Sequence, residues 1–494
     1  MKLKTLSIAM TLATVPMTGA FAAALDRSGQ SISPFLQAGN YFEAGISALD
    51  ADVSGAELGT DNKIGDMADS YYFPSAALKI QVNDKFSFGL LYDQPFGAKA
   101  KYSGDNIFVS NENNTILSQP ILDQMIEDAP ENRNNVMGAV QQFAARFAGT
   151  PLSSQNYAYL INAYDTNGNY TTDGTDSRNF KEDVDNAIRD AAEENIDAIN
   201  GLLGTGATEV DVHTQNLAWI FGFQPTKNLN LYAGPVYQTI KGDVKLRGQA
   251  YSLFNGYDAS IKETGDFGWL AGIAYQIPEI ALKASLTYRS EIDHDVTMKE
   301  NISALNALAL LELDPNEIRN AKGKTRITTP QSVNFDFQTG IAANTVAFAN
   351  VRWVEWSDFS IRPYKFGLTS EAVGELVGRP NGFNLVEYSD DQWSATVGVG
   401  RKLSEKWGGN VSVGWDSGAG NPVSTLGPTE GYWSVGLGAQ YSPAANYFIQ
   451  AGVKYFMLGD AKAQTGAQAG GDEYVAKFKD NDAWGYGLKI GYKF

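Results

Sequence analysis

The chain has 494 residues, with no cysteine, 50 glycines and 12% aromatic residues, and its formal net charge is −18. This acidic balance argues against nucleic-acid binding, which depends on lysine and arginine. The absence of cysteine excludes a disulfide framework, so the fold has to be stabilised in another way.

The N-terminal residues have the form of a secretory signal peptide. Met1–Lys4 is basic, a mildly apolar run follows to about Val15, and Ala20-Phe21-Ala22 provides the small residues of a cleavage site. We therefore expect residues 1–22 to be a signal peptide and the chain to be exported. The alternative is an apolar N-terminal helix of the mature protein, but the run is too short to span a bilayer.

From residue 41 onward, large apolar residues alternate with small or polar ones, and a period of two is typical of β-strands. The clearest segment is the C-terminal one, whose apolar face consists of Trp484, Tyr486, Leu488, Ile490, Tyr492 and Phe494. Such a face, ending in aromatic residues, is typical of outer-membrane strands that meet lipid. We expect an all-β fold, a transmembrane antiparallel barrel over 41–494 with about fourteen strands, near 41–49, 71–82, 85–103, 207–224, 229–251, 266–278, 280–298, 325–341, 345–362, 387–402, 407–416, 431–441, 447–458 and 483–494.

The connections between these segments alternate strictly between short and long. Tight turns are predicted at Asn83-Asp84, Thr226–Asn228, Pro278-Glu279, Ala343-Asn344, Ser404-Glu405 and Ser442-Pro443. An even-stranded barrel with both ends in the periplasm requires this pattern, with turns inside and loops outside. The long loops are expected near 50–70, 104–206, 252–265, 299–324, 363–386, 417–430 and 459–482.

The third predicted strand contains a break signal, Asp93-Gln94-Pro95-Phe96-Gly97. Proline cannot donate to the ladder and glycine allows unusual backbone angles, so a bulge or a break in pairing is expected here. Broken pairing is costly in a membrane unless the freed groups face a cavity, which a lateral opening would provide. The alternative is an ordinary strand end at the lipid boundary.

Two of the long loops have helical patterns. In 104–206 the apolar residues at helical spacing are Ile121, Leu122, Met125, Ile126, Val136, Met137, Val140, Phe143, Ala144 and Phe147, and a charged stretch follows over 181–203. The loop after the seventh strand holds Ile302, Leu305, Leu308, Leu310 and Leu313. Either these helices pack on each other and cap the barrel, or they leave an exposed apolar groove that captures a hydrophobic ligand.

Neither catalysis nor metal binding is expected. The two histidines are His213 and His294, and His294 lies in Asp293-His294-Asp295 without a nucleophile motif, so we interpret it as part of a solvated charge cluster. Residues 165–169 with Asp173 and Asp176 loosely resemble a calcium loop, but the glycine is misplaced and the terminal glutamate is missing. An Asn/Gly turn is the simpler interpretation, and we expect no cofactor and no metal.

Several motifs together resemble the long-chain fatty acid transporter family of outer-membrane proteins, of the FadL/TodX type. The resemblance covers roughly the whole mature chain and rests on the order and spacing of Leu286–Glu291, Trp356–Phe359, Trp415–Ser417 with Pro422-Val423, and Ala483–Gly487. It implies a fourteen-stranded barrel plugged by a small N-terminal hatch, here expected over 23–40. It also implies passive movement of hydrophobic compounds, with lateral exit beside a kinked third strand at Pro95, Phe96 and Gly97.

The resemblance further implies two basic contacts to a ligand carboxylate. Arg247 matches the basic residue of the fifth strand, and Arg362 lies one position from the basic residue that follows the Trp-Ser motif. Arginine suits this role because its planar fork binds carboxylates in a bidentate manner. The alternative is that each arginine pairs with a lumen carboxylate for structure. The hatch motif Asn-Pro-Ala of the family is missing here, which makes gating by the hatch uncertain.

The sequence thus predicts passive outer-membrane transport of long-chain fatty acids or related hydrophobic compounds. Alternatives are uptake of aromatic or aliphatic hydrocarbons, a porin for small polar solutes, and an adhesin that uses 104–206. The expected partners are the ligand, outer-membrane lipid and lipopolysaccharide, and the barrel-assembly machinery through Phe494. A monomer is expected, and no nucleic-acid partner.

Overall fold

The computed structural model describes residues 25–60, 62–110, 119–131, 133–147, 164, 170–171, 180–200, 205–303, 305, 314–374 and 378–494. The signal peptide expected over 1–22 lies outside the described residues. So do Leu308, Leu310 and Leu313 of the fourth long loop, and nearly all of the calcium-loop candidate. Within the described part of the chain, no helix is long and apolar enough to cross a membrane.

The strands form a closed antiparallel barrel of 14 strands, as the alternation predicts. The ring closes where the first strand pairs with the last, Tyr41 opposite Lys493, and the third strand is divided into two pieces. The barrel strands are β1 (Tyr41–Asp52), β4 (Tyr71–Gln81), β5 (Phe86–Asp93) with β6 (Gly97–Lys101), β9 (Glu209–Phe223), β10 (Leu229–Leu246), β11 (Tyr257–Ile277), β12 (Leu282–Arg289), β16 (Ser332–Ala342), β17 (Thr345–Val354), β20 (Gln392–Lys402), β21 (Trp407–Asp416), β23 (Tyr432–Ala444), β24 (Tyr447–Leu458) and β27 (Asp482–Lys493).

The two faces of the wall differ as a membrane requires. Large apolar side chains of β27 point outward, and Trp484, Leu488 and Ile490 are 43–51% exposed. Between them, Lys489 points into the lumen and pairs with Glu43 of β1 at 3.4 Å. An exposed apolar face on a closed barrel satisfies every backbone group within the sheet while it meets lipid.

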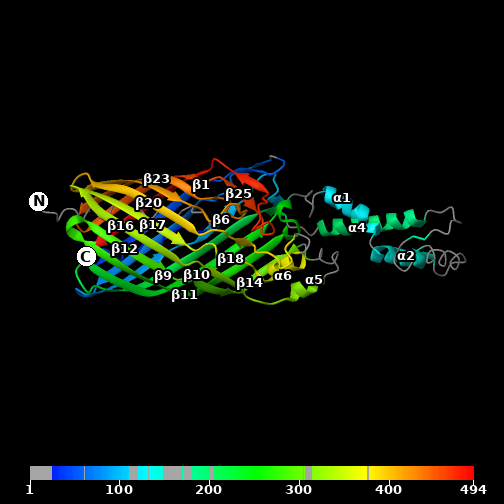
Figure 1. Ribbon diagram of the computed structural model, residues 1–494, viewed down its shortest axis with the longest axis horizontal. Coiled ribbons are helices and arrows are strands. Elements are labelled where there is room, and N and C mark those ends of the chain that lie inside the picture. The colour runs from blue at the N-terminus through cyan, green and yellow to red at the C-terminus, as the bar shows by residue number, and fades with distance from the viewer. Residues whose placement is uncertain are drawn as a thin grey trace.

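Short and long connections are sorted to opposite ends of the barrel, as predicted. We call the end with the tight turns and the C terminus the turn end, and the opposite end the loop end (Figure 1). Several predicted strands prove to be shorter than expected, among them the fifth, ninth and tenth, which are β10, β17 and β20. The sixth, β11, begins earlier than expected, inside the predicted loop 252–265. Two further strands bend. The seventh bends at Ser290-Glu291 and the eighth at Pro330-Gln331, and the pieces beyond these bends, β13 (Ile292–Val296) and β15 (Thr325–Thr329), pair with each other instead of extending the wall.

The loop end is closed by packed segments. Glu300, on β14 (Met298–Ile302), accepts hydrogen bonds from the first amides of α6 (Tyr364–Ala372), at Lys365 and Phe366. Phe366 stacks on Phe254 at 4.3 Å between ring centroids. The other short elements here are β2 (Gly55–Glu57), β3 (Lys63–Ile64), β22 (Val423–Ser424), β25 (Ala461–Gln464), β26 (Ala476–Phe478), β18 (Ser360–Ile361), β19 (Val386–Glu387), α5 (Pro315–Asn320) and the 3₁₀ turn η3 (Gln249–Phe254); η4 (Pro278–Ile280) lies at the turn end.

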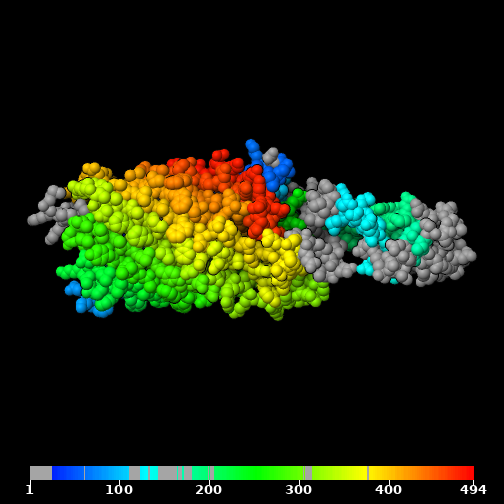
Figure 2. All heavy atoms as spheres, in the orientation of Figure 1, coloured from blue at the N-terminus to red at the C-terminus, as the bar shows by residue number. Residues whose placement is uncertain are grey.

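The long segment 104–206 forms a helical projection that lies beyond the loop end (Figures 1 and 2). It contains α1 (Gln119–Asp128), η2 (Ala129–Glu131), α2 (Arg133–Phe147) and α4 (Phe180–Asn200). Val136 and Val140 of α2 pack on Val184 and Ile188 of α4. Of the two alternatives for these helices, the structure therefore favours packing on each other for these residues. At its base, β7 (Val109–Ser110) pairs with β8 (Gly206–Ala207).

Candidate functional site

The predicted break in the third strand is present and has a simple geometric cause. Asp93 is opposite Asn216 of β9, and Gly97 is opposite His213. Three residues, 94–96, therefore face only two on β9, which is the residue count of a β-bulge. Phe96 keeps contact with β9 through Thr214, whose hydroxyl accepts from the Phe96 amide at 2.9 Å.

The break leaves an opening in the wall between β4 and β6. β4 pairs with β5 only from Ala76 onward, and the next contact along this edge is the bridge between Ala68 and Ala100 of β6, so residues 71–75 lie along the break without a ladder. We call this opening the wall gap. Pro74 lies on its edge, where a missing amide donor does no harm. Toward the loop end the gap closes again, because the Lys101 amide donates to the Met67 carbonyl at 2.8 Å.

The described part of the N-terminal segment, residues 25–40, lies inside the barrel and reaches the wall gap. The Arg27 amide donates to the Pro95 carbonyl at 2.6 Å, and the Gly97 amide donates to the Leu25 carbonyl at 2.8 Å. Backbone groups that the break frees are thus satisfied by the N-terminal segment. The same segment carries Phe35, which is fully buried against Tyr232 of β10 at 5.7 Å between ring centroids.

A buried ion pair fixes this segment to the far wall. Arg352 of β17 donates from Nε to Asp26 at 2.6 Å and from Nη2 to the other Asp26 oxygen at 3.3 Å. Gln30 and Asn334 accept further hydrogen bonds from the same guanidinium at 3.1 and 2.6 Å. Both charged side chains are 2% exposed, so their desolvation is offset by a full set of partners.

Arg27, the neighbour of Asp26, lies in the wall gap itself. Its guanidinium carbon is 3.8 Å from the centre of the Tyr71 ring. Gly97 permits this position, because an added Cβ there would lie 2.5 Å from Arg27 Cζ. Burial lowers the pKa of Arg27, while Tyr71 and the charge of Asp211 act in the opposite direction.

An apolar cavity lies in the lumen next to this segment. Its lining is almost entirely aliphatic, with no charged side chain. Leu25 of the N-terminal segment and Ala98 of β6 contribute to it, so it adjoins both sides of the strand break. The other lining residues include Val212, Ile240, Ile261, Leu385, Tyr388 and Leu426.

A second, smaller cavity continues from the first toward the wall gap. Ala98, Leu426 and Gly427 line both cavities. The second is bounded on the wall side by Met67–Ala68 and Tyr71 of one strand edge and by 97–100 of the other. Together the two cavities extend from the lumen to the wall gap.

A third cavity, at the turn end, is polar. It lies between the N-terminal segment and the strands β12 to β24. Its lining includes Ser33, Lys283, Asn334, Asp336, Asn410 and Lys454. We call it the polar chamber. Water and hydrophilic groups suit it, and it differs sharply from the apolar cavity on the other side of the N-terminal segment.

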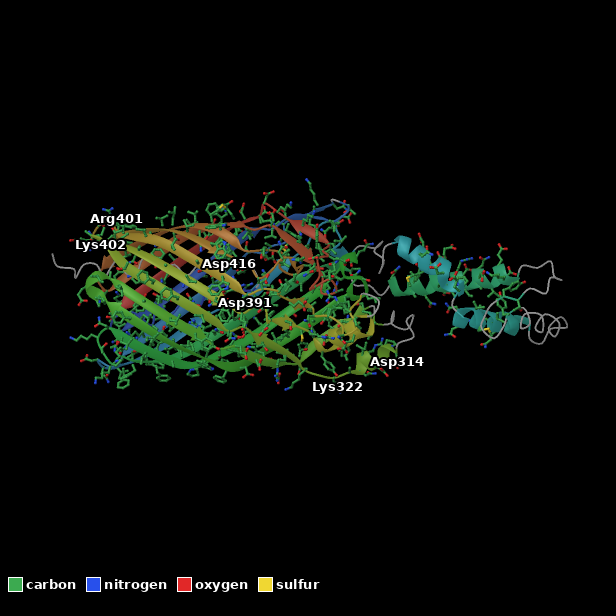
Figure 3. The ribbon with its side chains drawn as sticks, viewed as in Figure 1. Asp314, Lys322, Asp391, Arg401, Lys402 and Asp416 are labelled. Atoms are coloured by element: carbon green, nitrogen blue, oxygen red, sulfur yellow. The ribbon has the colours of Figure 1, made fainter. Side chains whose placement is uncertain are left out.

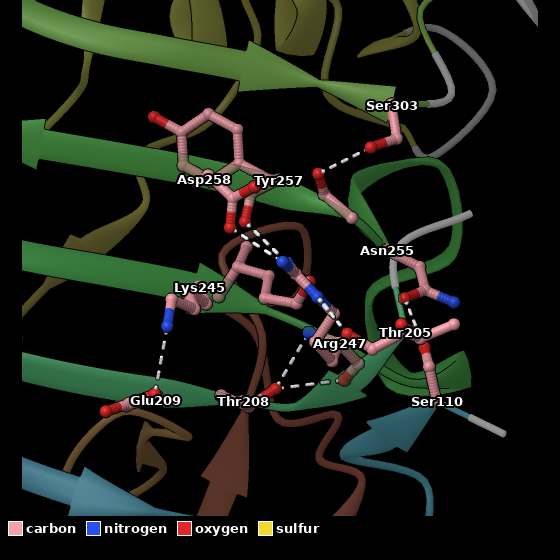
Figure 4. Close-up of polar contacts among 12 residues, drawn as sticks. Ser110, Thr205, Thr208, Glu209, Lys245, Arg247, Asn255, Tyr257, Asp258 and Ser303 are labelled. Carbon is pink, nitrogen blue, oxygen red and sulfur yellow. Dashed lines mark hydrogen bonds and ion pairs between the residues drawn. The ribbon is translucent and has the colours of Figure 1, made fainter. Parts of the chain in front are cut away.

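Arg247 and Arg362, the predicted carboxylate contacts, lie at the loop end and line none of these three cavities. Arg247 follows β10 and is buried (Figure 4). Its Nη2 donates to Asp258 at 2.7 Å, and its other donors bond the carbonyls of Thr205, Leu246 and Tyr257. Arg362 follows β18 and donates to Glu371 at 2.6 Å. Their part as ligand contacts stays a prediction, since each guanidinium already has protein acceptors.

The Trp-Ser motif has a structural role at the loop end. Trp356 is fully buried and donates from Nε1 to Gln392 at 2.8 Å, and the Ser357 hydroxyl donates to Asp391 at 2.6 Å. Asp416, at the end of the next strand, accepts from Gln392 at 2.7 Å. Figure 3 shows Asp391 and Asp416 at the ends of neighbouring strands, far from Arg401 and Lys402 at the turn end.

The interpretation of His294 as part of a solvated cluster is wrong. His294 is fully buried, and its ring nitrogen Nε2 lies 2.9 Å from Gln238 Oε1. Its neighbours Asp293 and Asp295 are exposed, since residues of β13 alternate between the lumen and solvent. No group of histidines and carboxylates in the described part of the chain is placed to hold a metal ion.

Sequence reasoning named Pro95, Phe96 and Gly97, and the structure brings all three to the wall gap. It missed Asp26 and Arg27. Their contacts, with Arg352, Tyr71 and Gly97, are far away in the chain, so no local pattern marks them. The one available signal was a pair of charges in a segment otherwise made of small and apolar residues.

Comparison with known proteins places the chain in a family. The model of the family described as outer membrane protein transport protein (OMPP1/FadL/TodX) matches residues 199–494. No curated protein matches the sequence. The fold is similar to the crystal structure of a Pseudomonas aeruginosa FadL homologue, with a TM-score of 0.60, 12% identity and 98% of this chain and 99% of that chain covered. It is also similar to the Pseudomonas putida toluene transporter TodX, with a TM-score of 0.51, 10% identity and 97% of each chain covered.

Proposed function

This chain belongs to the outer membrane protein transport family (OMPP1/FadL/TodX), and on that premise we propose that it carries long-chain fatty acids or related hydrophobic compounds across the membrane without an energy source. The protein is a bacterial outer-membrane barrel of a family that transports hydrophobic compounds. The family match indicates a transporter and not an enzyme. The turn end then faces the periplasm and the loop end the outside.

The observation that carries the proposal is the pair of adjacent cavities, which share Ala98, Leu426 and Gly427 in their linings. The ligand would occupy the apolar cavity, where its chain leaves water with a gain of about 25 cal/mol per Å² of apolar surface. It would then pass Ala98 and Leu426 into the second cavity and leave sideways through the wall gap. Because residues 25–27 fill the gap in this conformation, exit requires that segment to move.

The proposed partners follow from the outward face of the barrel and from its C-terminal residue. The outward apolar face would meet lipid and lipopolysaccharide. Phe494 is half exposed and its ring stacks on that of Tyr492, so it is accessible to the barrel-assembly machinery. We propose a monomer, because the described barrel closes on itself and both cavities are lined by one chain.

The proposal is tested by uptake. Cells that lack their own transporter would be given labelled oleate, toluene or a small sugar, with and without this protein. Uptake of oleate or toluene, and not of sugar, is expected. Entry of sugar alone would overturn the proposal.

A porin for small polar solutes is the second candidate, and the polar chamber is the observation that favours it. The chamber carries Lys283 and Lys454 beside neutral polar side chains. A porin would conduct ions steadily in a planar bilayer. We expect low conductance, because residues 25–40 cross the lumen between the chamber and the loop end.

A further inference from the structure

Arg27 differs from Arg352, the buried arginine that binds the N-terminal segment, in one respect. Two of the donor atoms of its guanidinium have no hydrogen-bond partner among the described residues. These atoms are Nε and Nη2, although Arg27 is only 2% exposed. On Arg352 the same two atoms hold the two oxygens of Asp26. A buried cation normally has a carboxylate or several acceptors, because burial without them is costly.

The surroundings of Arg27 hold the guanidinium in place without using these two atoms. The Tyr71 ring lies against its face at 3.8 Å, a cation–π contact that leaves Nε and Nη2 without a partner. Gly97 provides the space on another side. Asp211 acts on the guanidinium through its charge, and its Oδ1 lies beside His213 Nε2.

Arg27 lines neither cavity itself, but residues beside it line both. Leu25, two residues before Arg27, lines the apolar cavity, and Gly97 lines the second cavity at the wall gap. An acyl chain in the apolar cavity could therefore place its head group at Arg27. The edge formed by Nε and Nη2 matches the two oxygens of a carboxylate, as Arg352 and Asp26 demonstrate within the same lumen.

We propose that Arg27 binds the carboxylate of an amphipathic ligand, such as a long-chain monocarboxylic acid, as the ligand moves from the apolar cavity to the wall gap. This inference rests on the proposed function and specifies the substrate class. In the conformation described, the unpaired atoms are fully buried, so the carboxylate reaches them only when residues 25–27 shift. Recognition of the head group is thereby coupled to opening of the gap.

The test compares an acid with its neutral ester. Binding of oleate and of methyl oleate to the purified full-length protein in detergent would be measured for the wild type, Arg27→Gln, Arg27→Lys and the control Arg326→Gln. Arg326 is exposed on β15 and pairs with Asp295 at 3.1 Å, and it lines none of the three cavities. Circular dichroism and heat-dependent mobility on a denaturing gel would verify folding.

We expect Arg27→Gln to weaken oleate binding about tenfold or more, since hydrogen bonds to a charged group are lost, and to leave methyl oleate binding unchanged. Arg27→Lys keeps the charge but not the fork, so it should fall between Gln and wild type. Should Arg27→Gln misfold, the oleate to methyl oleate ratio of Arg27→Lys decides, and an unchanged ratio overturns the inference.

Other outcomes separate this inference from the proposed function. Equal losses for acid and ester would show that Arg27 only plugs the gap, and no loss for either would exclude the site. A wild type that binds methyl oleate or toluene but not oleate would overturn the carboxylate site while transport of hydrophobic compounds stands. A wild type that binds none of them would overturn the proposed function itself.

Discussion

At the scale of single residues, the Asp26–Arg352 pair decides whether the N-terminal segment stays in the lumen. Removing one partner leaves a buried charge without compensation, which costs roughly 3–5 kcal/mol. Because the chain has no cysteine, Ser31→Cys, beside the polar chamber, can report on the position of the segment through its rate of thiol labelling.

We predict that Arg352→Met in the Ser31→Cys background accelerates labelling on the order of a hundredfold or more, given the cost of the unpaired charge. The double change Asp26→Asn with Arg352→Met removes both charges, so its labelling rate should return toward that of the reporter alone. Labelling that is equally fast in the single and the double variant would contradict the idea that charge compensation anchors the segment.

Arg247 is predicted to stabilise the loop end. Arg247→Ala removes a buried set of hydrogen bonds to Asp258, Thr205 and Tyr257, each worth about 1–3 kcal/mol when it leaves a buried group unpaired. Limited proteolysis within the segment that follows residue 247 should therefore be on the order of tenfold faster in the variant than in the wild type. Lys245→Ala is the matched control, because its ion pair with Glu209 is exposed and contributes little.

The proteolysis result also bears on the ligand role of Arg247. If Arg247→Ala weakens binding of oleate but leaves methyl oleate binding and proteolysis unchanged, the residue is a carboxylate contact. Sequence spacing could point to Arg247 because the motif is local. It could not show that the guanidinium already has four acceptors, since three of them come from residues outside that motif.

At the scale of elements, the third strand could be predicted well and its neighbours less so. Pro95 and Gly97 mark the break directly in the sequence. Pro330 likewise marks the bend of the eighth strand. The bend of the seventh carries no such clear signal, because Ile292, His294 and Val296 continue the alternation. Which partner a strand takes is a non-local matter, and here β13 takes β15 and turns inward, so that His294 is buried and not solvated.

We predict that deleting Pro95 closes the wall gap. Residues 94–96 oppose only two residues of β9, so the deletion equalises the count and allows one continuous ladder from β5 to β6. Uptake of hydrophobic compounds should fall by about tenfold or more, since the side exit is lost. The barrel should stay folded, which its heat-dependent mobility on a denaturing gel would verify.

Pro235→Ala is the matched control for that deletion. Pro235 also lies inside a strand, but the pairing of β10 with β9 resumes in the same register beyond it. It should therefore leave uptake unchanged. Full uptake after deletion of Pro95, in a folded barrel, would mean that the ligand does not leave through the wall gap.

At the scale of the whole molecule, the sequence was sufficient for the barrel, its two ends and the position of the projection, because alternation and loop length are properties of the chain itself. The cavities could not be predicted. The apolar cavity draws its lining from the N-terminal segment, the barrel wall and the loop end, as with Leu25, Ile240 and Leu385. Only the closed fold brings such distant residues together, and the sequence therefore suggested the ligand class without the binding place.

The helical projection is predicted to be dispensable for the barrel and for ligand binding. Its base is closed by the pairing of Val109–Ser110 with Gly206–Ala207, and the apolar residues of α2 and α4 pack on each other. Replacing residues 111–204 by a short Gly-Ser turn should leave the affinity of the barrel for oleate or methyl oleate unchanged within about twofold, and its thermal stability unchanged, since distant independent parts add without coupling.

The control is the same replacement within the loop end, at residues 364–372. It should disrupt ligand binding, because Phe366 packs in the apolar cluster there. Loss of ligand binding in a folded barrel without the projection would instead identify the helices as the place where the ligand is first captured.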